Sequence, residues 1–183
     1  PYSKRDGDAF VGDFREKGIL ADALINYLAL LGWSPGDDRE TMTRQDLVDA
    51  FTLDRVQQTP AQMDVRKLEN LNGHYMAELD EDEFLRLAQD AARDFEWYPG
   101  DGDARFETVC RLLQSRTKKL TDVRDWGHFF RDRPEYDEKA AGKFIGKEQP
   151  AAALADAADR LEACDWRADA IEAAAAAAAE NNG

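Results

Sequence analysis

Apolar residues recur along much of the chain at the spacing of an amphipathic helix. Between Ile19 and Leu31 they follow an i, i+3, i+4, i+7 pattern, which predicts a helix of about three to four turns. Gly32 comes directly after this run, where a left-handed C-cap residue often ends a helix. The Pro- and Gly-containing stretch 33–38 then predicts a turn.

The same pattern returns through the rest of the chain. Thr43 and Asp46 have the spacing of a capping box, so a short helix is expected from there to Ala50. No alternating run rich in Val, Ile and Thr competes as a strand, and the predicted fold class is all-α. Further helices are expected over residues 64–77, 81–97, 103–115, 121–130, 150–163 and 166–180.

Pro and Gly residues divide the chain without a long linker. The stretch 98–102 interrupts the middle, and 134–150 has the weakest helical signal. We place a domain boundary near residue 78, which gives regions 1–78 and 79–183. The seven alanines 173–179 favour helix but offer little apolar area, so they either admit a second helix closely or belong to a helix whose packing partner is elsewhere.

Charge restricts the partners that the chain can bind. With 38 acidic and 24 basic residues the net charge is −14, which disfavours sequence-blind attraction to nucleic acid. Any RNA contact must therefore be local, and the cluster Arg116-Thr117-Lys118-Lys119 is the place for it, with Arg111 and Arg124 nearby. A cluster of this size is also typical of a solvated helix end.

Metal, export and membrane signals are weak. Cys110 and Cys164 form no Cys-x-x-Cys pair and have only His74 and His128 as further soft ligands, so we expect no metal site and interpret both cysteines as buried thiols, with a disulfide as the alternative. There is no run of 18 apolar residues and no signal-peptide pattern, which leaves the cytoplasm as the expected location, without a membrane partner.

One ordered string of residues is more specific. Ser3-Lys4-Arg5 is followed by Val11-Gly12-Asp13-Phe14-Arg15 and then by a helix that ends in Leu31-Gly32-Trp33. This string resembles the bacterial glutamyl-tRNA synthetases, class I enzymes in which a Lys-x-Ser-Lys-Arg signature loop leads into such a helix. The resemblance continues through Leu71-Asn72-Gly73-His74-Tyr75 and, over residues 106–131, through the cluster that contains Arg116.

The resemblance also has departures. Pro1 stands where the first Lys of the signature would fall, and the aromatic Tyr2 replaces an aliphatic residue. Family members carry a Rossmann half with a His-x-Gly-His motif upstream of this loop. We therefore expect a fragment of such an enzyme, with helices that contact the tRNA stem followed by a helical-bundle anticodon-binding domain truncated at Gly183. By itself the fragment is expected to be inactive.

The resemblance implies roles for the signature residues. Lys4 is the candidate catalytic residue, because a lysine at this place can stabilise the charge that builds on pyrophosphate when glutamate attacks ATP. Ser3, Lys4 and Arg5 together are the candidate ATP-binding residues, and ATP with Mg²⁺ is the implied cofactor of the parent enzyme.

The resemblance also implies tRNA contacts. Arg116 corresponds to an arginine that reads an anticodon base, and Lys118 and Lys119 would then lie along the RNA backbone. For Arg116 the alternative is a structural role, because a cation in the last turn of a helix complements the helix dipole.

The implied function is part of a glutamate-tRNA ligase that recognises tRNA(Glu). The partners would be tRNA(Glu), glutamate and ATP, with no DNA, and the expected state is a monomer. Two alternatives stay open: a freestanding helical tRNA-binding or protein-interaction module without catalytic activity, and a structural helical protein with no RNA role. The sequence does not say whether glutamine tRNA would also be charged.

Overall fold

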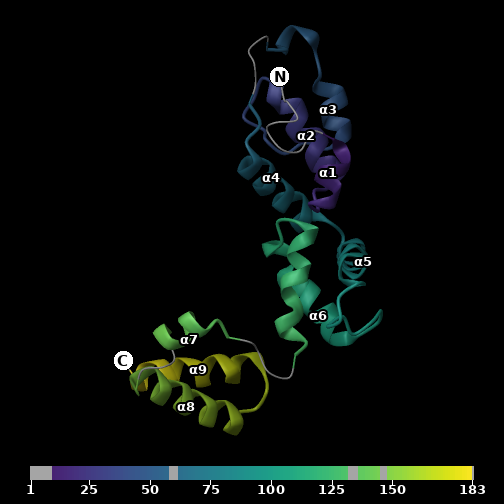
Figure 1. Cartoon of the computed structure of the whole chain (residues 1–183). Coiled ribbons are helices and arrows are strands. Elements are labelled where there is room, and N and C mark those ends of the chain that lie inside the picture. The colour runs from purple at the N-terminus through teal and green to yellow at the C-terminus, as the bar shows by residue number, and fades with distance from the viewer. Residues whose placement is uncertain (1–9, 58–61, 132–135, 145–147, 183) are drawn as a thin grey trace. The chain divides into compact units, whose positions relative to one another are not determined.

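The computed structural model describes residues 10–57, 62–131, 136–144 and 148–182. These residues form helices and loops, with a single-residue β-bridge and no β-strand among them, which confirms the all-α prediction (Figure 1). The elements in chain order are α1 Val11–Glu16, α2 Ala21–Gly32, α3 Arg44–Ala50, η1 Leu53–Arg55, α4 Val65–Glu78, α5 Glu81–Ala92, α6 Ala104–Leu113, η2 Gln114–Arg116, η3 Leu120–Phe129, α7 Glu138–Phe144, α8 Glu148–Ala163 and α9 Ala168–Asn182.

The helix predicted up to Leu31 is present as α2, but its predicted end is wrong. Gly32 is the last helical residue and is not left-handed; Trp33 follows it with φ −146°, in extended conformation. The reason is that residues 56 and 57 hold the chain in an extended conformation there. The carbonyl of Gly32 accepts a hydrogen bond from Gln57 N at 2.8 Å, and Trp33 pairs with Val56 in the isolated bridge.

The capping box predicted for α3 is confirmed. Thr43 Oγ1 accepts a hydrogen bond from Asp46 N at 3.1 Å, and Asp46 Oδ2 accepts one from Thr43 N at 2.9 Å. The two helices α2 and α3 are joined at both ends. Asp22 pairs with Arg44 at their starts, and the rings of Trp33 and Phe51 lie 5.7 Å apart beyond their ends.

Other element boundaries differ from the sequence prediction. The helix expected over 81–97 ends at Ala92, because Trp97 leaves the helical path to stack between Phe95 and Phe130, at 5.5 and 5.4 Å. The segment expected as a helix over 121–130 is the 3₁₀ helix η3. The six-residue α1 and the seven-residue α7 were not predicted.

Three apolar clusters hold the described residues up to 131 together, the smallest of them formed by Trp33, Met42 and Leu47. Phe84, Phe106 and Trp126 are at the centre of one cluster, which joins α5, α6 and η3. Tyr27 and Leu68 belong to a second cluster, which joins α1, α2 and α4. Burial of large side chains such as these contributes on the order of 2 kcal/mol each.

Residues 1–132 and 133–183 form two compact units, and the boundary that we expected at residue 78 stays a prediction. In the second unit α8 packs against the alanine-rich α9 (Figure 1). Ala178 is only 4% exposed, and Asn181 Nδ2 donates to Asp156 Oδ2 at 3.3 Å. The alanine run therefore admits a second helix closely, which is the first of the two alternatives. Trp166, in the loop between α8 and α9, is exposed.

Both cysteines are free thiols. Cys110 is buried, as predicted, whereas Cys164 is half-buried and its Sγ lies 3.3 Å from Leu161 O. Within the described residues no group of three or more His, Cys, Asp or Glu could hold a metal ion. The described helices include none with the length and apolar character needed to cross a membrane.

Candidate nucleic-acid interface

The signature residues Ser3, Lys4 and Arg5 lie outside the described residues. Their predicted roles in catalysis and ATP binding therefore stay predictions. The other predicted site, the cationic cluster that includes Arg116, lies entirely within the described part of the chain.

The cations of this cluster differ in how far their charge is already neutralised. Lys119 Nζ lies 2.8 Å from Glu69 Oε1, and both side chains are about two-thirds buried or more, at 28% and 31% exposure. Arg111 lies 3.5 Å from Glu81, and Arg124 lies 3.4 Å from Asp125. Each of these cations has an acidic neighbour that competes with a phosphate group for it.

Arg116 and Lys118 have no such neighbour. Both are exposed, and the described residues place no carboxylate within 4.0 Å of either charged group. Arg116 is the last residue of η2, and Lys118 Nζ donates to Asn70 Oδ1 on α4 at 2.8 Å. These two side chains are therefore the cations of the cluster that are open to an anionic ligand.

Lys118 extends over one face of α4. Asp64 caps this helix by accepting hydrogen bonds from Arg66 N at 2.9 Å and Lys67 N at 3.2 Å. Helical spacing then places five partly or fully exposed residues on one side of α4, none of them acidic. We call this set the α4 strip: Arg66, Asn70, Gly73, His74 and Ala77.

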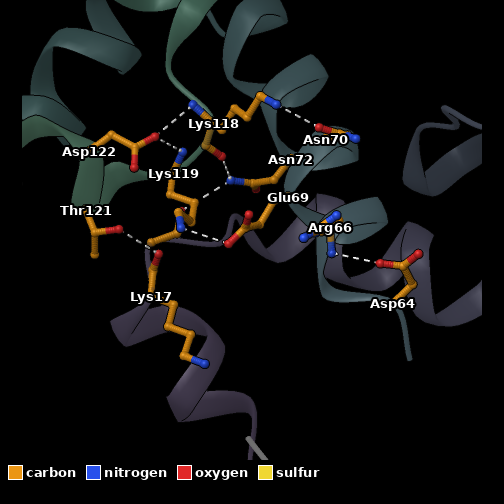
Figure 2. Close-up of polar contacts among 11 residues, drawn as sticks. Lys17, Asp64, Arg66, Glu69, Asn70, Asn72, Lys118, Lys119, Thr121 and Asp122 are labelled. Atoms are coloured by element: carbon orange, nitrogen blue, oxygen red, sulfur yellow. Dashed lines mark hydrogen bonds and ion pairs between the residues drawn. The ribbon is translucent and has the colours of Figure 1, made fainter. Parts of the chain in front are cut away.

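The glycine of the strip gives Lys118 its place. A Cβ atom at Gly73 would lie 3.3 Å from Lys118 Cγ, so the lysine stem crosses the helix where the side chain is smallest. Figure 2 shows Lys118 reaching Asn70 above α4, while Lys119 turns away toward Glu69. The Lys118 ammonium thus adds a positive charge at one edge of the α4 strip.

A groove of about 610 Å³ runs along the other edge of the strip, between α2 and α4. Leu30 and Leu71 line it from the apolar side. Lys67 and Glu40 face each other across 2.8 Å at its margin. The hydrogen bond from the Lys67 ammonium lowers the pKa of Glu40, and the same contact raises the pKa of Lys67, so this pair is ionised at neutral pH.

Beneath the strip, one buried amide joins three segments. Asn72 Oδ1 accepts a hydrogen bond from Leu20 N at 2.8 Å, and Asn72 Nδ2 donates to Gly18 O at 3.3 Å and to Lys118 O at 2.5 Å. Asp122 Oδ2 accepts from the backbone N–H groups of Lys118 and Lys119, at 3.1 and 3.0 Å (Figure 2). The hydrogen bonds from Asn72 and to Asp122 therefore hold the backbone of Lys118 and Lys119 in place.

Comparison with known proteins bears directly on this site. The sequence model described as "tRNA synthetases class I (E and Q), catalytic domain" matches residues 2–70, and that described as "Anticodon binding domain" matches residues 83–183. The glutamate-tRNA ligase of Streptomyces avermitilis is 36% identical over 186 residues, which cover 99% of this chain. The chain belongs to the glutamate-tRNA ligase family.

Two further glutamate-tRNA ligases are similar to this chain over most or all of its length. The glutamate-tRNA ligase of Thermobifida fusca is 38% identical over 94% of this chain. The crystal structure of a glutamate tRNA ligase from Elizabethkingia meningosepticum in complex with its amino acid matches 100% of this chain at 25% identity, with a TM-score of 0.78. The chain spans only 37% of each of these two ligase sequences and 39% of the crystallised chain.

The glutamate-tRNA ligase resemblance did not single out every residue of the interface. Arg66 and Asn70 were missed, although their i, i+4 spacing on a helix face without acids was a usable signal. His74 is exposed in the α4 strip. Asn72 was missed too, and its signal was a polar residue on the apolar face that Leu68 and Leu71 define.

Proposed function

We propose that this chain is the tRNA(Glu)-recognising part of a glutamate-tRNA ligase. The observation that supports the proposal is a pair of exposed, unneutralised cations in a chain whose net charge is −14. Lys118 reaches over the acid-free α4 strip, and Arg116 ends η2, which packs against α4. In so acidic a chain, RNA can be held only where the local charge is positive and carboxylates are turned away.

The side chains suit a folded RNA. The guanidinium of Arg116 presents a fork of donors that fits a base edge or a phosphate, whereas the Lys118 ammonium acts as a point charge toward phosphate. The Lys118 stem covers Gly73, and the small side chain of Ala77 keeps the next turn of the α4 strip low, so a sugar-phosphate backbone can approach the helix there. Shape and backbone contacts of this kind dominate the recognition of double-stranded RNA.

The signature residues belong to the same proposal. Lys4, with Ser3 and Arg5, would assist the ATP-dependent activation of glutamate and its attachment to tRNA(Glu). When bound, ATP with Mg²⁺ supplies the activated phosphorus and the pyrophosphate leaving group. We further propose a cytoplasmic monomer without a DNA or membrane partner.

A binding titration tests the proposal. The 183-residue chain is titrated with tRNA(Glu) and with a tRNA altered in its anticodon, at low salt. Arg116→Ala should weaken binding of tRNA(Glu) by about tenfold and reduce discrimination between the two tRNAs. Arg86→Ala is the matched control, because Arg86 is an exposed arginine on α5 that lies 3.5 Å from Asp90.

The control should leave both affinities unchanged. If Arg116→Ala leaves the ratio of the two affinities untouched, Arg116 only complements its helix end and its anticodon role is withdrawn. If the unmodified chain does not bind tRNA(Glu) at low salt, the proposed function of this chain is wrong.

A further inference from the structure

We propose that Asn72 is a positioning residue that transmits RNA binding at Arg116 and Lys118 to the turn formed by residues 17–20. This turn leads from α1 into α2, and α1 follows the signature residues Ser3 to Arg5 in the chain. The inference rests on the proposed function, because it takes tRNA as the ligand. Beyond the proposed function, the inference states how bound tRNA would affect the turn 17–20, which lies close in the chain to the signature residues.

The first argument is the burial of Asn72. Its side chain is 0% exposed and its amide makes three hydrogen bonds, one to each of Leu20 N, Gly18 O and Lys118 O. A buried polar group that loses its partners costs far more than an exposed one, so all three contacts must be kept together. A shift of one partner is therefore opposed by the other two.

The second argument is that the same two segments also touch directly. Leu120 N donates to Gly18 O at 3.1 Å, and Thr121 Oγ1 donates to Lys17 O at 3.1 Å. Gly18 has φ +78°, and a Cβ atom there would lie 2.5 Å from Leu120 N. The turn and the start of η3 are thus in contact, with no room for a side chain at Gly18. Figure 2 shows the contact between Thr121 and Lys17.

The third argument is the double role of Lys118. Its ammonium is on the RNA-facing side, bonded to Asn70, while its carbonyl oxygen accepts the 2.5 Å hydrogen bond from Asn72. An RNA phosphate that draws the ammonium therefore restrains the same residue that Asn72 holds. Asn72 carries that restraint to Gly18 and Leu20 within one side chain.

Amide hydrogen exchange of the 183-residue chain, followed by NMR with and without tRNA(Glu), tests this route. The reporters are the amides of Gly18 and Ile19, which donate to Arg15 O and Phe14 O and do not depend on Asn72 as an acceptor. In the unmodified chain tRNA should slow their exchange by about fivefold. In Asn72→Ala this response should fall by more than half, because only the direct contacts of Leu120 and Thr121 with the turn remain. The Lys119 amide, which donates to Asp122, should keep its own response.

Gln114→Ala is the matched control. Gln114 is also a buried amide that donates to two backbone carbonyls, Met76 O at 3.1 Å and Leu79 O at 2.8 Å, but it does not bond to the turn 17–20. It should lose stability as Asn72→Ala does, and keep the response at Ile19. If Asn72→Ala does not fold, Asn72→Ser takes its place with the same expectation, because a hydroxyl has a single donor hydrogen and cannot replace the bonds to both Gly18 O and Lys118 O.

The outcomes separate the inference from the proposed function. If tRNA binds but the exchange of Ile19 does not change, or if a folded Asn72 variant keeps the full response, the inference is wrong and the proposed function stands. If tRNA does not bind the unmodified chain, both are wrong. Loss of the response in Gln114→Ala would also overturn the inference, because general destabilisation would then explain it.

Discussion

The side-chain nitrogen of Asn72 lies 2.5 Å from the carbonyl oxygen of Lys118, although 46 residues separate them in the chain. Through this contact α4 holds the segment that connects η2 to η3, and through the other bonds of the same amide it holds the turn before α2. Three parts of the chain thus depend on each other's position at one point.

Gly18→Ala should lower the free energy of unfolding by about 2–4 kcal/mol, because the residue needs φ +78° and a Cβ atom would meet the backbone of Leu120. Gly12→Ala is the matched control. Gly12 lies within α1 with no atom within 4 Å of its Cβ position, so alanine should be neutral there or raise stability by up to about 1 kcal/mol. Urea unfolding of the two variants measures the difference, and equal values would contradict the packing of the turn against η3.

Phe106→Ala should lower the free energy of unfolding by about 3–5 kcal/mol, because the ring is fully buried among Tyr98, Trp126 and Phe130. Leu112→Ala, on the same helix α6 but 68% exposed, should change it by less than about 0.5 kcal/mol. Thermal or urea unfolding compares the two. Similar losses would mean that α6 packs on a different face.

Thiol labelling should distinguish the two cysteines. Burial raises the pKa of Cys110 to about 12, so at pH 8 almost none of it is thiolate in the folded chain. Cys164 is half-buried, and an iodoacetamide titration at pH 8 should modify Cys164 alone until the chain is unfolded in urea, when both thiols react. In Cys164→Ala the folded chain should take up no label, and rapid labelling of that variant would contradict the burial of Cys110.

Lys118→Ala and Lys119→Ala should differ in RNA binding although the residues are neighbours. Lys118→Ala should weaken tRNA(Glu) binding and make the salt dependence shallower by about one unit, because one phosphate contact is lost. Lys119 is already paired with Glu69, so Lys119→Ala should leave the salt dependence nearly unchanged. Titrations at several salt concentrations measure both slopes, and equal slopes would show that the ion pair opens to bind RNA.

Local patterns predicted those helices whose signals are local. Periodic apolar residues gave α2, and a capping box gave α3. The period of η3 was also present in the sequence: Leu120, Val123, Trp126 and Phe129 recur at every third residue, which is the repeat of a 3₁₀ helix rather than of an α-helix. The extended end of α2 could not be predicted, since it depends on the distant residues Val56 and Gln57.

The same distinction applies to the interface. Arg116 and Lys118 could be chosen from residue type and position in the family motif, because charge is a property of the residue itself. Whether a charge is neutralised by another side chain cannot be seen from residue type, because it depends on the folded structure. Lys119 stands next to Lys118 but is neutralised by Glu69, 50 residues earlier. The role of Asn72 depends on Gly18 and Lys118 meeting at α4, which no single segment encodes.

The distribution of indole rings gives each compact unit its own optical reporter. The chain has four tryptophans, of which Trp33 and Trp126 are buried, Trp97 is half-buried and Trp166 is 77% exposed. Trp166 is the one that belongs to residues 133–183. Because indole fluorescence shifts to longer wavelength in water and exposed rings are quenched by iodide, the quenchable red-edge emission follows the second unit and the protected blue-edge emission follows the first. A single fluorescence melt can therefore resolve the loss of one unit from the loss of the other without any added label.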